Sequence, residues 1–94
     1  MKTVELDLTG CRYPMQIHTR IKEAFDFPDY YGHNWDAFCD FLWSECDVQK
    51  VIIKGERGLP KELDEDITIM YECLNEKVKN AKQYNELFTY ETVS

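Results

Sequence analysis

The chain has 94 residues and a formal net charge of −7, from 18 acidic and 11 basic side chains. This length predicts a single domain with a modest core and little room for a deep cofactor cavity. The acidic balance argues against sequence-independent nucleic-acid binding, which needs a positively charged surface, and would speed encounter with a basic partner. No apolar run is long enough to span a membrane, and the first residues lack the apolar region of a secretory signal, so we expect a cytoplasmic protein.

The first half of the chain predicts one strand followed by two helices. Residues 3–8 alternate polar and apolar side chains, which is typical of a strand with one buried face. Pro14 to Phe25 has a proline suited to a first helical turn and apolar residues at helical spacing. Pro28 follows the end of that helix. Asn34 is a good N-cap for a second helix, which should run to about residues 44–45.

The second half predicts a strand, a long helix and a final strand. Residues 48–54 contain a continuous run of β-branched apolar side chains, which predicts a central strand buried on both faces. Residues 60–63 could form a short helical segment. Residues 64–82 have an apolar stripe with acidic side chains at the start and lysines at the end, as a helix dipole favours. Residues 86–93 close the chain as a strand.

This order of elements predicts a two-layer α/β fold. Strands separated by helices favour parallel pairing through right-handed crossovers. With the apolar strand in the centre, the strand order is 1-2-3, and both crossovers place their helices on the same face of the sheet. We therefore expect a three-stranded parallel sheet with helices packed on it.

The cysteines and histidines do not form a recognisable metal or catalytic motif. The chain has four cysteines: Cys11, Cys39, Cys46 and Cys73. No two of them form a CxxC pair, and none has the spacing to a histidine that is typical of a zinc site. An even count would fit two disulfides in an exported protein, but the lack of an export signal favours free thiols in a reducing compartment. His18 is interpreted as a surface residue. We expect neither a metal nor another cofactor.

The helix beginning at Trp35 carries the clearest functional signal, because the 3.6-residue period gives it two different faces. The apolar face consists of Trp35, Phe38, Phe41 and Leu42. The other face consists of Asp36, Cys39, Asp40 and Trp43. The first is an ordinary core face, whereas the second places two carboxylates beside a large aromatic ring.

We call this second face, with Asp36, Cys39, Asp40 and Trp43, the acidic face. The residues alone leave three interpretations of it open. Exposed acidic residues are usually only solvated, and Trp43 could fold back onto the core. Alternatively, the two carboxylates could accept charge-assisted hydrogen bonds from a basic partner, with the aromatic ring supplying buried area. A general acid/base pair or a Mg²⁺ site is the third interpretation, but no nucleophile or further ligand stands nearby.

The loop before this helix has its own candidates. Tyr30 and Tyr31 could pack as a lid over the core or extend the binding face, because tyrosine presents both a ring and a hydroxyl. Gly32 is interpreted as a residue with positive φ.

The segment from Pro28 to Leu42 resembles the signature of the barstar family, which are small intracellular inhibitors of secreted ribonucleases of the barnase type. The matching residues are Pro28, Asp29, Tyr30, Tyr31, Gly32, Asn34, Asp36, Ala37, Asp40 and Leu42. The predicted order of elements is also similar to the family fold. The resemblance implies a single barstar-like domain over residues 1–94, without enzymatic activity.

The resemblance also implies a mechanism, because family members insert the second helix and the preceding loop into the ribonuclease active site. It places Asp40 at the position of the family's central aspartate, where the RNA phosphate would bind. It implies a 1:1 complex with a basic ribonuclease or related toxin, and no contact with nucleic acid or membrane. The expected partner-binding residues are Tyr30, Asn34, Asp36, Cys39, Asp40, Trp43 and Ser44.

Two departures from the family pattern lie on the contact face. Family members often carry tryptophan where Cys39 stands, so the aromatic contact is expected to have moved to Trp43, about one helical turn on. The family's contact glutamate on the last helix has two candidate counterparts, Glu76 and Asn80. These departures keep open a barstar-like module for a different basic toxin or regulatory protein, and a small hydrolase is the third alternative.

Overall fold

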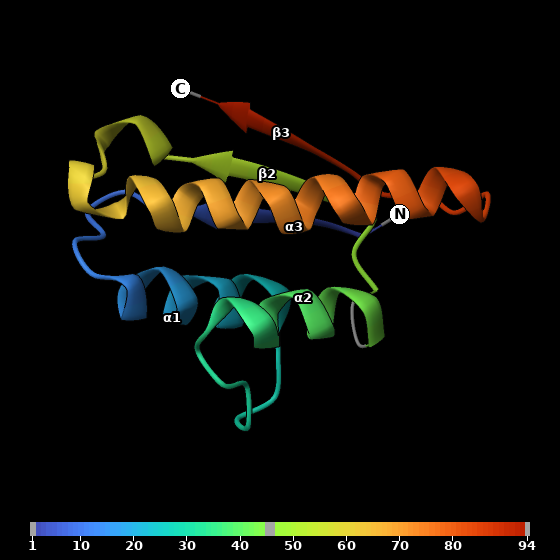
Figure 1. The fold of residues 1–94 in the computed structure, drawn as a ribbon, viewed down its shortest axis with the longest axis horizontal. Helices are drawn as coiled ribbons and strands as arrows, with labels where there is room; N and C mark the ends of the chain where they lie inside the picture. The colour runs from blue at the N-terminus through green and yellow to red at the C-terminus, as the bar shows by residue number, and fades with distance from the viewer. Residues whose placement is uncertain (1, 45–46, 94) are drawn as a thin grey trace.

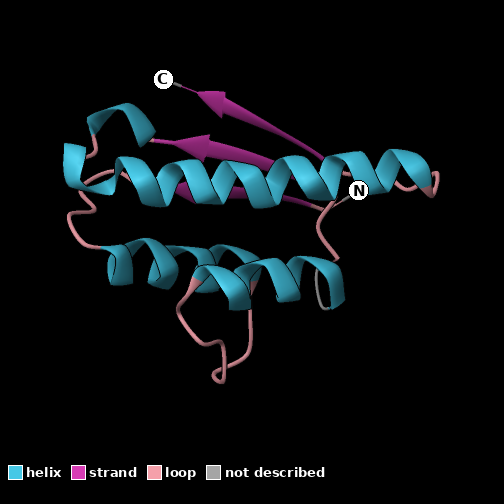
Figure 2. Ribbon diagram, viewed as in Figure 1, coloured by secondary structure: helices cyan, strands magenta, loops and turns pink. Residues whose placement is uncertain are grey.

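The computed structural model describes residues 2–44 and 47–93, and this part of the chain forms three strands, three α-helices and two short 3-10 helices (Figures 1 and 2). In chain order they are β1 (Thr3–Asp7), α1 (Pro14–Phe25), α2 (Trp35–Ser44), β2 (Lys50–Lys54), η1 (Glu56–Gly58), η2 (Lys61–Leu63), α3 (Asp64–Gln83) and β3 (Thr89–Val93). All the predicted helices and strands are present; α1 has the predicted bounds, and the ends of the other elements are shifted. β3 begins later than predicted because the chain first turns back on α3, where the Glu86 N–H donates to the Ala81 carbonyl.

The sheet is parallel with the strand order β1-β2-β3, so the predicted α/β architecture is confirmed. The central strand is β2, whose Val51 pairs with Val4 on one side and Tyr90 on the other. The inward-facing side chains of β1 and β2 are buried: Val4, Leu6, Val51 and Ile53. Their strand neighbours are exposed or half-buried, which places the helices together on the inner face of the sheet (Figure 2).

The outer face of the sheet is open, and the expectation that β2 is buried on both faces is wrong. Ile52 points to that face and is only half-buried. It is flanked by ion pairs rather than by helices, with Lys54 Nζ 3.2 Å from Glu5 and Lys50 Nζ 3.3 Å from Glu91. The apolar run at 51–53 therefore reflects the central position of the strand, and not cover on both sides.

The helices bury one continuous core against the inner face of the sheet. Its largest fully buried side chains come from all three helices and from β1, β2 and the segments that follow them: Leu6, Leu8, Ile17, Ile21, Phe38, Leu42, Val51, Ile53, Leu63, Met70 and Leu74. The predicted apolar stripe of α3 faces this core, although Tyr71 and Val78 at its margin are half-buried. Burying such a side chain contributes about 1.5–3 kcal/mol, so the core fixes α2 firmly against the rest of the fold.

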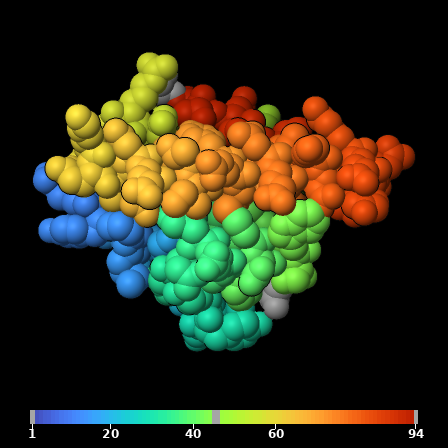
Figure 3. All heavy atoms as spheres, in the orientation of Figure 1, coloured from blue at the N-terminus to red at the C-terminus, as the bar shows by residue number. Residues whose placement is uncertain are grey.

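The arrangement leaves α2 and the loop before it on the surface of the molecule. Figure 3 shows α3 lying across one side, with α2 and its preceding loop forming a continuous surface beneath it. No helix within the described residues is long and apolar enough to cross a membrane.

Candidate protein-binding face

The loop between α1 and α2 divides its two tyrosines between the core and the surface. Tyr31 is buried, and its ring centroid lies 5.2 Å from that of Phe27 and 5.5 Å from that of Phe41. Tyr30 is 72% exposed, with its ring 5.8 Å from Phe41 at the edge of α2. The packing role therefore belongs to Tyr31, whereas a binding role for Tyr30 stays a prediction.

His18 is buried, so the expectation of a surface histidine is wrong. Its Nδ1 atom lies 2.8 Å from the Tyr31 hydroxyl, and its ring centroid is 4.3 Å from that of Trp35. Burial lowers the pKa of His18 to about 4, with a smaller lowering by His33 and an opposing effect of Asp66. His18 is therefore neutral at pH 7 and connects α1 to the loop and to the start of α2.

Acidification is expected to destabilise the protein through His18. An unfolded histidine takes up its proton near pH 6.5, whereas buried His18 does so only near pH 4. Between these values the unfolded state binds more protons, so the free energy of unfolding falls as the pH falls, by about 2 kcal/mol from pH 7 to pH 5. Urea denaturation at both pH values measures this drop. His18→Gln should abolish it, and His33→Asn should retain it; equal drops in both variants would contradict the assignment.

The chain enters α2 through a tight turn. The expectation of a positive φ at Gly32 is wrong, because His33 adopts it instead, with φ 50° and its Nδ1 2.9 Å from the Tyr31 carbonyl oxygen. Gly32 provides space, since a Cβ there would lie 3.0 Å from Nδ2 of Asn34. Asn34 uses that space to donate to the Gly32 carbonyl at 3.0 Å while its Oδ1 accepts from the Ala37 N–H at 2.7 Å. The predicted N-cap is therefore confirmed.

Removing the cap should destabilise the protein without changing the acidic face. Asn34→Ala is expected to lower the free energy of unfolding by about 1 kcal/mol, because the Ala37 N–H loses its acceptor. Asn34→Asp retains an acceptor oxygen and should remain close to wild type. Urea denaturation of the three proteins makes the comparison, and an unchanged midpoint in Asn34→Ala would show that the cap contributes little.

The face of α2 that points away from the core carries Asp36 and Asp40 one helical turn apart. Both residues are exposed, and the buried residues of the same helix are Phe38, Phe41 and Leu42. None of the ion pairs or side-chain hydrogen bonds among the described residues engages either carboxylate. The predicted exposed face is confirmed for Asp36, Asp40 and Trp43, whereas Cys39 is half-buried and packs against the core.

Trp43 remains 51% exposed at the end of this face and has not folded back into the core. Trp43 lines a cavity of about 110 Å³ together with Asn80 of α3. Asn80 is half-buried there, and the alternative counterpart, Glu76, is exposed elsewhere on α3. Ser44 is exposed, and its hydroxyl donates to the Asp40 carbonyl at 2.9 Å. Of the two candidate counterparts, Asn80 lines a cavity together with Trp43, and Glu76 does not line that cavity.

Cys39 forms a disulfide with Cys73 of α3, which corrects the expectation of free thiols at these two positions. Packing of α2 on α3 brings their Cα atoms to 5.6 Å, although they are 34 residues apart in the chain. Cys73 is buried, and Cys39 is half-buried. Cys11 is a free buried thiol, and Cys46 lies outside the described residues. The bond fixes the acidic face to the longest helix.

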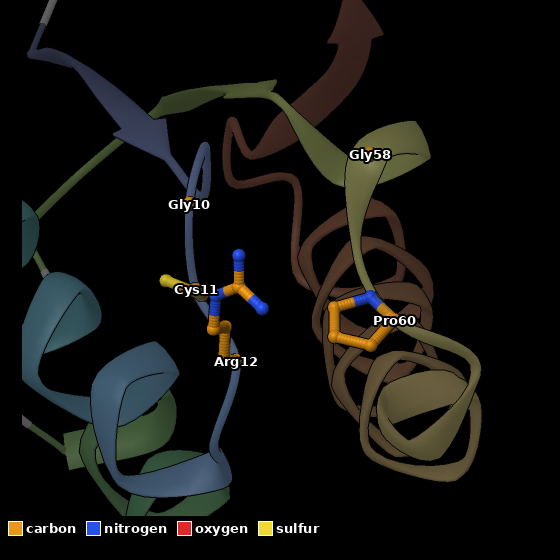
Figure 4. Close-up of a pocket in the computed structure, with 5 residues that line it drawn as sticks. All are labelled: Gly10, Cys11, Arg12, Gly58 and Pro60. Carbon is orange, nitrogen blue, oxygen red and sulfur yellow. The ribbon is translucent and has the colours of Figure 1, made fainter.

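A hollow beside Cys11 lacks the groups of a reactive or metal-binding site. Gly10, Cys11 and Arg12 line a cavity of about 230 Å³ across from Pro60 (Figure 4). The Cys11 sulfur points away from Arg12, and burial raises the pKa of the thiol, which disfavours the reactive thiolate. No cluster of three or more metal-ligating side chains occurs among the described residues.

Comparison with known proteins decides the family. The family model described as "Barstar (barnase inhibitor)" matches residues 1–92. The chain belongs to the barstar family. It is also 40% identical over 37 residues to "Putative ribonuclease inhibitor YrdF" of Bacillus subtilis (strain 168), an alignment that covers 39% of this chain and 41% of that relative.

The barstar-family signature of this chain contains two kinds of residue. One kind builds the loop and the start of the helix, by burial, close approach or capping: Tyr31, Gly32, Asn34 and Ala37. The other kind is exposed: Asp36 and Asp40, which take no part in that packing, and Asp29, whose carboxylate pairs with Lys22 of α1 at 3.1 Å. The structural residues therefore determine where the exposed carboxylates lie.

The structure adds residues that the sequence interpretation missed. The indole N–H of Trp35 donates to Asp66 of α3 at 2.8 Å, which ties the start of α2 to the start of α3. Tyr84 and Glu86 border the same cavity as Trp43. Glu86 was assigned to a strand, and no local pattern connects these residues with α2. Only the turn after α3 brings them there.

Proposed function

We propose that this barstar-family protein is a non-enzymatic inhibitor that binds a basic ribonuclease of the barnase type and occludes its active site. The observation that carries the proposal is that Asp36 and Asp40 present exposed carboxylates, in no ion pair with any other described residue, on a helix held by the core. A ribonuclease active site is a basic cleft that accepts phosphate. Carboxylates on a rigid helix can occupy the phosphate position with little loss of backbone conformational entropy on binding.

The surrounding residues fit the same role. Tyr30 and Trp43 are exposed on either side of the carboxylates along the chain and can supply buried aromatic area. Asn34 and Ser44 lie exposed at the two ends of α2, and Cys39 contributes its half-buried disulfide instead of a thiol. The net charge of −7 would raise the association rate with a basic partner. We place the inhibitor in the cytoplasm of the cell that produces the ribonuclease.

An inhibition assay with purified barnase tests the proposal. Equimolar protein should abolish cleavage of RNA, and calorimetric titration should give one inhibitor bound per ribonuclease. RNA cleavage that continues at a large excess of the protein would rule out barnase itself as a target.

A second candidate partner is a basic toxin or regulatory protein that is not a ribonuclease. The changed contact residues favour it, because the aromatic group lies at Trp43 and a disulfide stands at Cys39. Affinity capture from the source organism, followed by mass spectrometry, separates the two candidates. A parallel capture with the Asp40→Ala variant as bait identifies the partners that use the acidic face. These partners should bind the wild-type bait and be lost with the variant.

A further inference from the structure

The cavity beside Trp43 lies where the end of α2 meets the last turns of α3. It has a volume of about 110 Å³ and is lined by Trp43, Lys77, Asn80, Ala81, Tyr84 and Glu86. A larger hollow of about 350 Å³ shares Lys77 and Glu86 with it. Figure 1 shows the C-terminal part of α3 extending beyond the end of α2. The cavity therefore continues the acidic face of α2 onto α3 and the turn that follows.

The turn after α3 places an aromatic ring and a carboxylate at this cavity. The Tyr84 N–H donates to the Asn80 carbonyl at 3.1 Å, and the Glu86 N–H donates to the Ala81 carbonyl at 2.7 Å. Between them, Asn85 has φ 61°, which reverses the chain. The backbone groups are thus used by the turn, while the Tyr84 side chain stays 65% exposed.

The groups that line the cavity favour a planar cation. Trp43 and Tyr84 offer aromatic faces, on which a guanidinium stacks better than a lysine ammonium. Glu86 offers a carboxylate that takes part in none of the ion pairs of the described residues. Lys77 also lines the cavity and could compete with a ligand for the Glu86 carboxylate. Its Nζ instead lies over the Phe88 ring, 5.7 Å from the ring centroid.

We infer that this cavity is an arginine subsite, which takes an arginine side chain of the basic protein bound by the acidic face. Its guanidinium packs against Trp43 and Tyr84 and donates to Glu86. The occupant follows from charge complementarity and from continuity, since Trp43 borders both the α2 face and the cavity. The identity of the protein that presents the arginine rests on the proposed function, whereas guanidinium binding does not.

Titration with N-acetyl-arginine amide tests the subsite without any protein partner. The two indole N–H signals in nitrogen–proton NMR spectra give an internal comparison, because Trp43 borders the cavity and Trp35 is bonded to Asp66. The Trp43 signal should shift saturably while the Trp35 signal stays in place. N-acetyl-citrulline amide, which has the same shape without the charge, should have no such effect. An unmoved Trp43 signal, or equal shifts with both compounds, would overturn the subsite.

Substitutions at exposed residues test whether the shift of the Trp43 signal comes from binding in this cavity. Tyr84→Ala and Glu86→Gln should each weaken arginine-amide binding roughly 3- to 30-fold. Leu87→Ala removes an exposed apolar side chain, 59% accessible, that lines the larger neighbouring hollow but not this cavity, and should leave binding unchanged. Unchanged circular dichroism and melting temperature exclude a folding defect. Equal loss in the Leu87 variant would count against the assignment.

The same variants, measured in complexes with barnase, test whether an arginine of that protein occupies the cavity. Tyr84→Ala and Glu86→Gln should weaken that complex by a similar factor, and in combination by less than the product of the two. If arginine amide binds the cavity but neither substitution affects the complex, the subsite stands and its assignment to that partner is wrong. If barnase does not bind at all, the proposed function fails for that target, and the amide titration alone decides the subsite.

Discussion

Replacing Asp40 with alanine should weaken binding to barnase by at least about 2 kcal/mol, which is about 30-fold in affinity. Truncating a charged residue at the centre of an interface removes its own hydrogen bonds and leaves the facing cations without a partner. The Asp40 carboxylate is exposed and unpaired among the described residues, so binding would not first have to break an internal ion pair. Calorimetry gives the affinity, and residual RNA cleavage gives an independent measure.

Two further variants separate a local contact from long-range attraction. Asp40→Asn keeps the shape and removes only the charge, so most of the loss should remain. Glu91→Gln removes one charge from the outer face of the sheet, where Glu91 pairs with Lys50 at 3.3 Å. This exposed pair contributes at most about 1 kcal/mol to stability, and its loss should hardly change the affinity. Equal weakening by Asp40→Ala and Glu91→Gln would make the phosphate-mimic role of Asp40 wrong.

Reducing the disulfide between Cys39 and Cys73 is expected to lower the free energy of unfolding by about 2–4 kcal/mol. The bond joins residues 34 apart in the chain, and its loss returns conformational freedom to the unfolded state. It is also the covalent link between α2 and α3. Urea denaturation with and without dithiothreitol at one pH measures the effect.

Cysteine variants assign this effect to the bond. The double variant Cys39→Ser, Cys73→Ser should unfold like reduced wild type and should not respond to dithiothreitol. Cys11→Ala removes a thiol that is in no disulfide and should keep the response. Rapid alkylation of Cys39 in the native, unreduced protein would show that the bond is absent. Because disulfides are rare in a reducing cytoplasm, the affinity for barnase should be measured in both forms.

Local chemistry explains why the elements could be predicted. A helix or strand follows from side-chain period, caps and turn residues within a few positions. The Asn34 cap and the range Pro14–Phe25 were therefore predictable, and so was the division of α2 into a buried and an exposed face. One error is local, because the positive φ lies at His33 and not at Gly32. The errors at His18, Cys39 and Ile52 concern residues whose surroundings come from elsewhere in the chain. His18 has a polar side chain in an amphipathic helix, and only the packed loop supplies Tyr31 as its partner.

The amino-acid sequence by itself determined the order of the elements, the parallel sheet, the two carboxylates on one helix face and membership of the barstar signature. The carboxylates and the signature depend on neighbours along the chain, whereas the parallel sheet follows from the order of the elements through the general rules for crossovers. Only the tertiary structure decided that Cys39 bonds to Cys73, that Ile52 faces an open sheet surface, and that Tyr84 and Glu86 border the cavity at Trp43. The reason is physical: contacts between distant residues depend on how helices pack and where a chain reverses, and neither leaves a periodic pattern in the sequence.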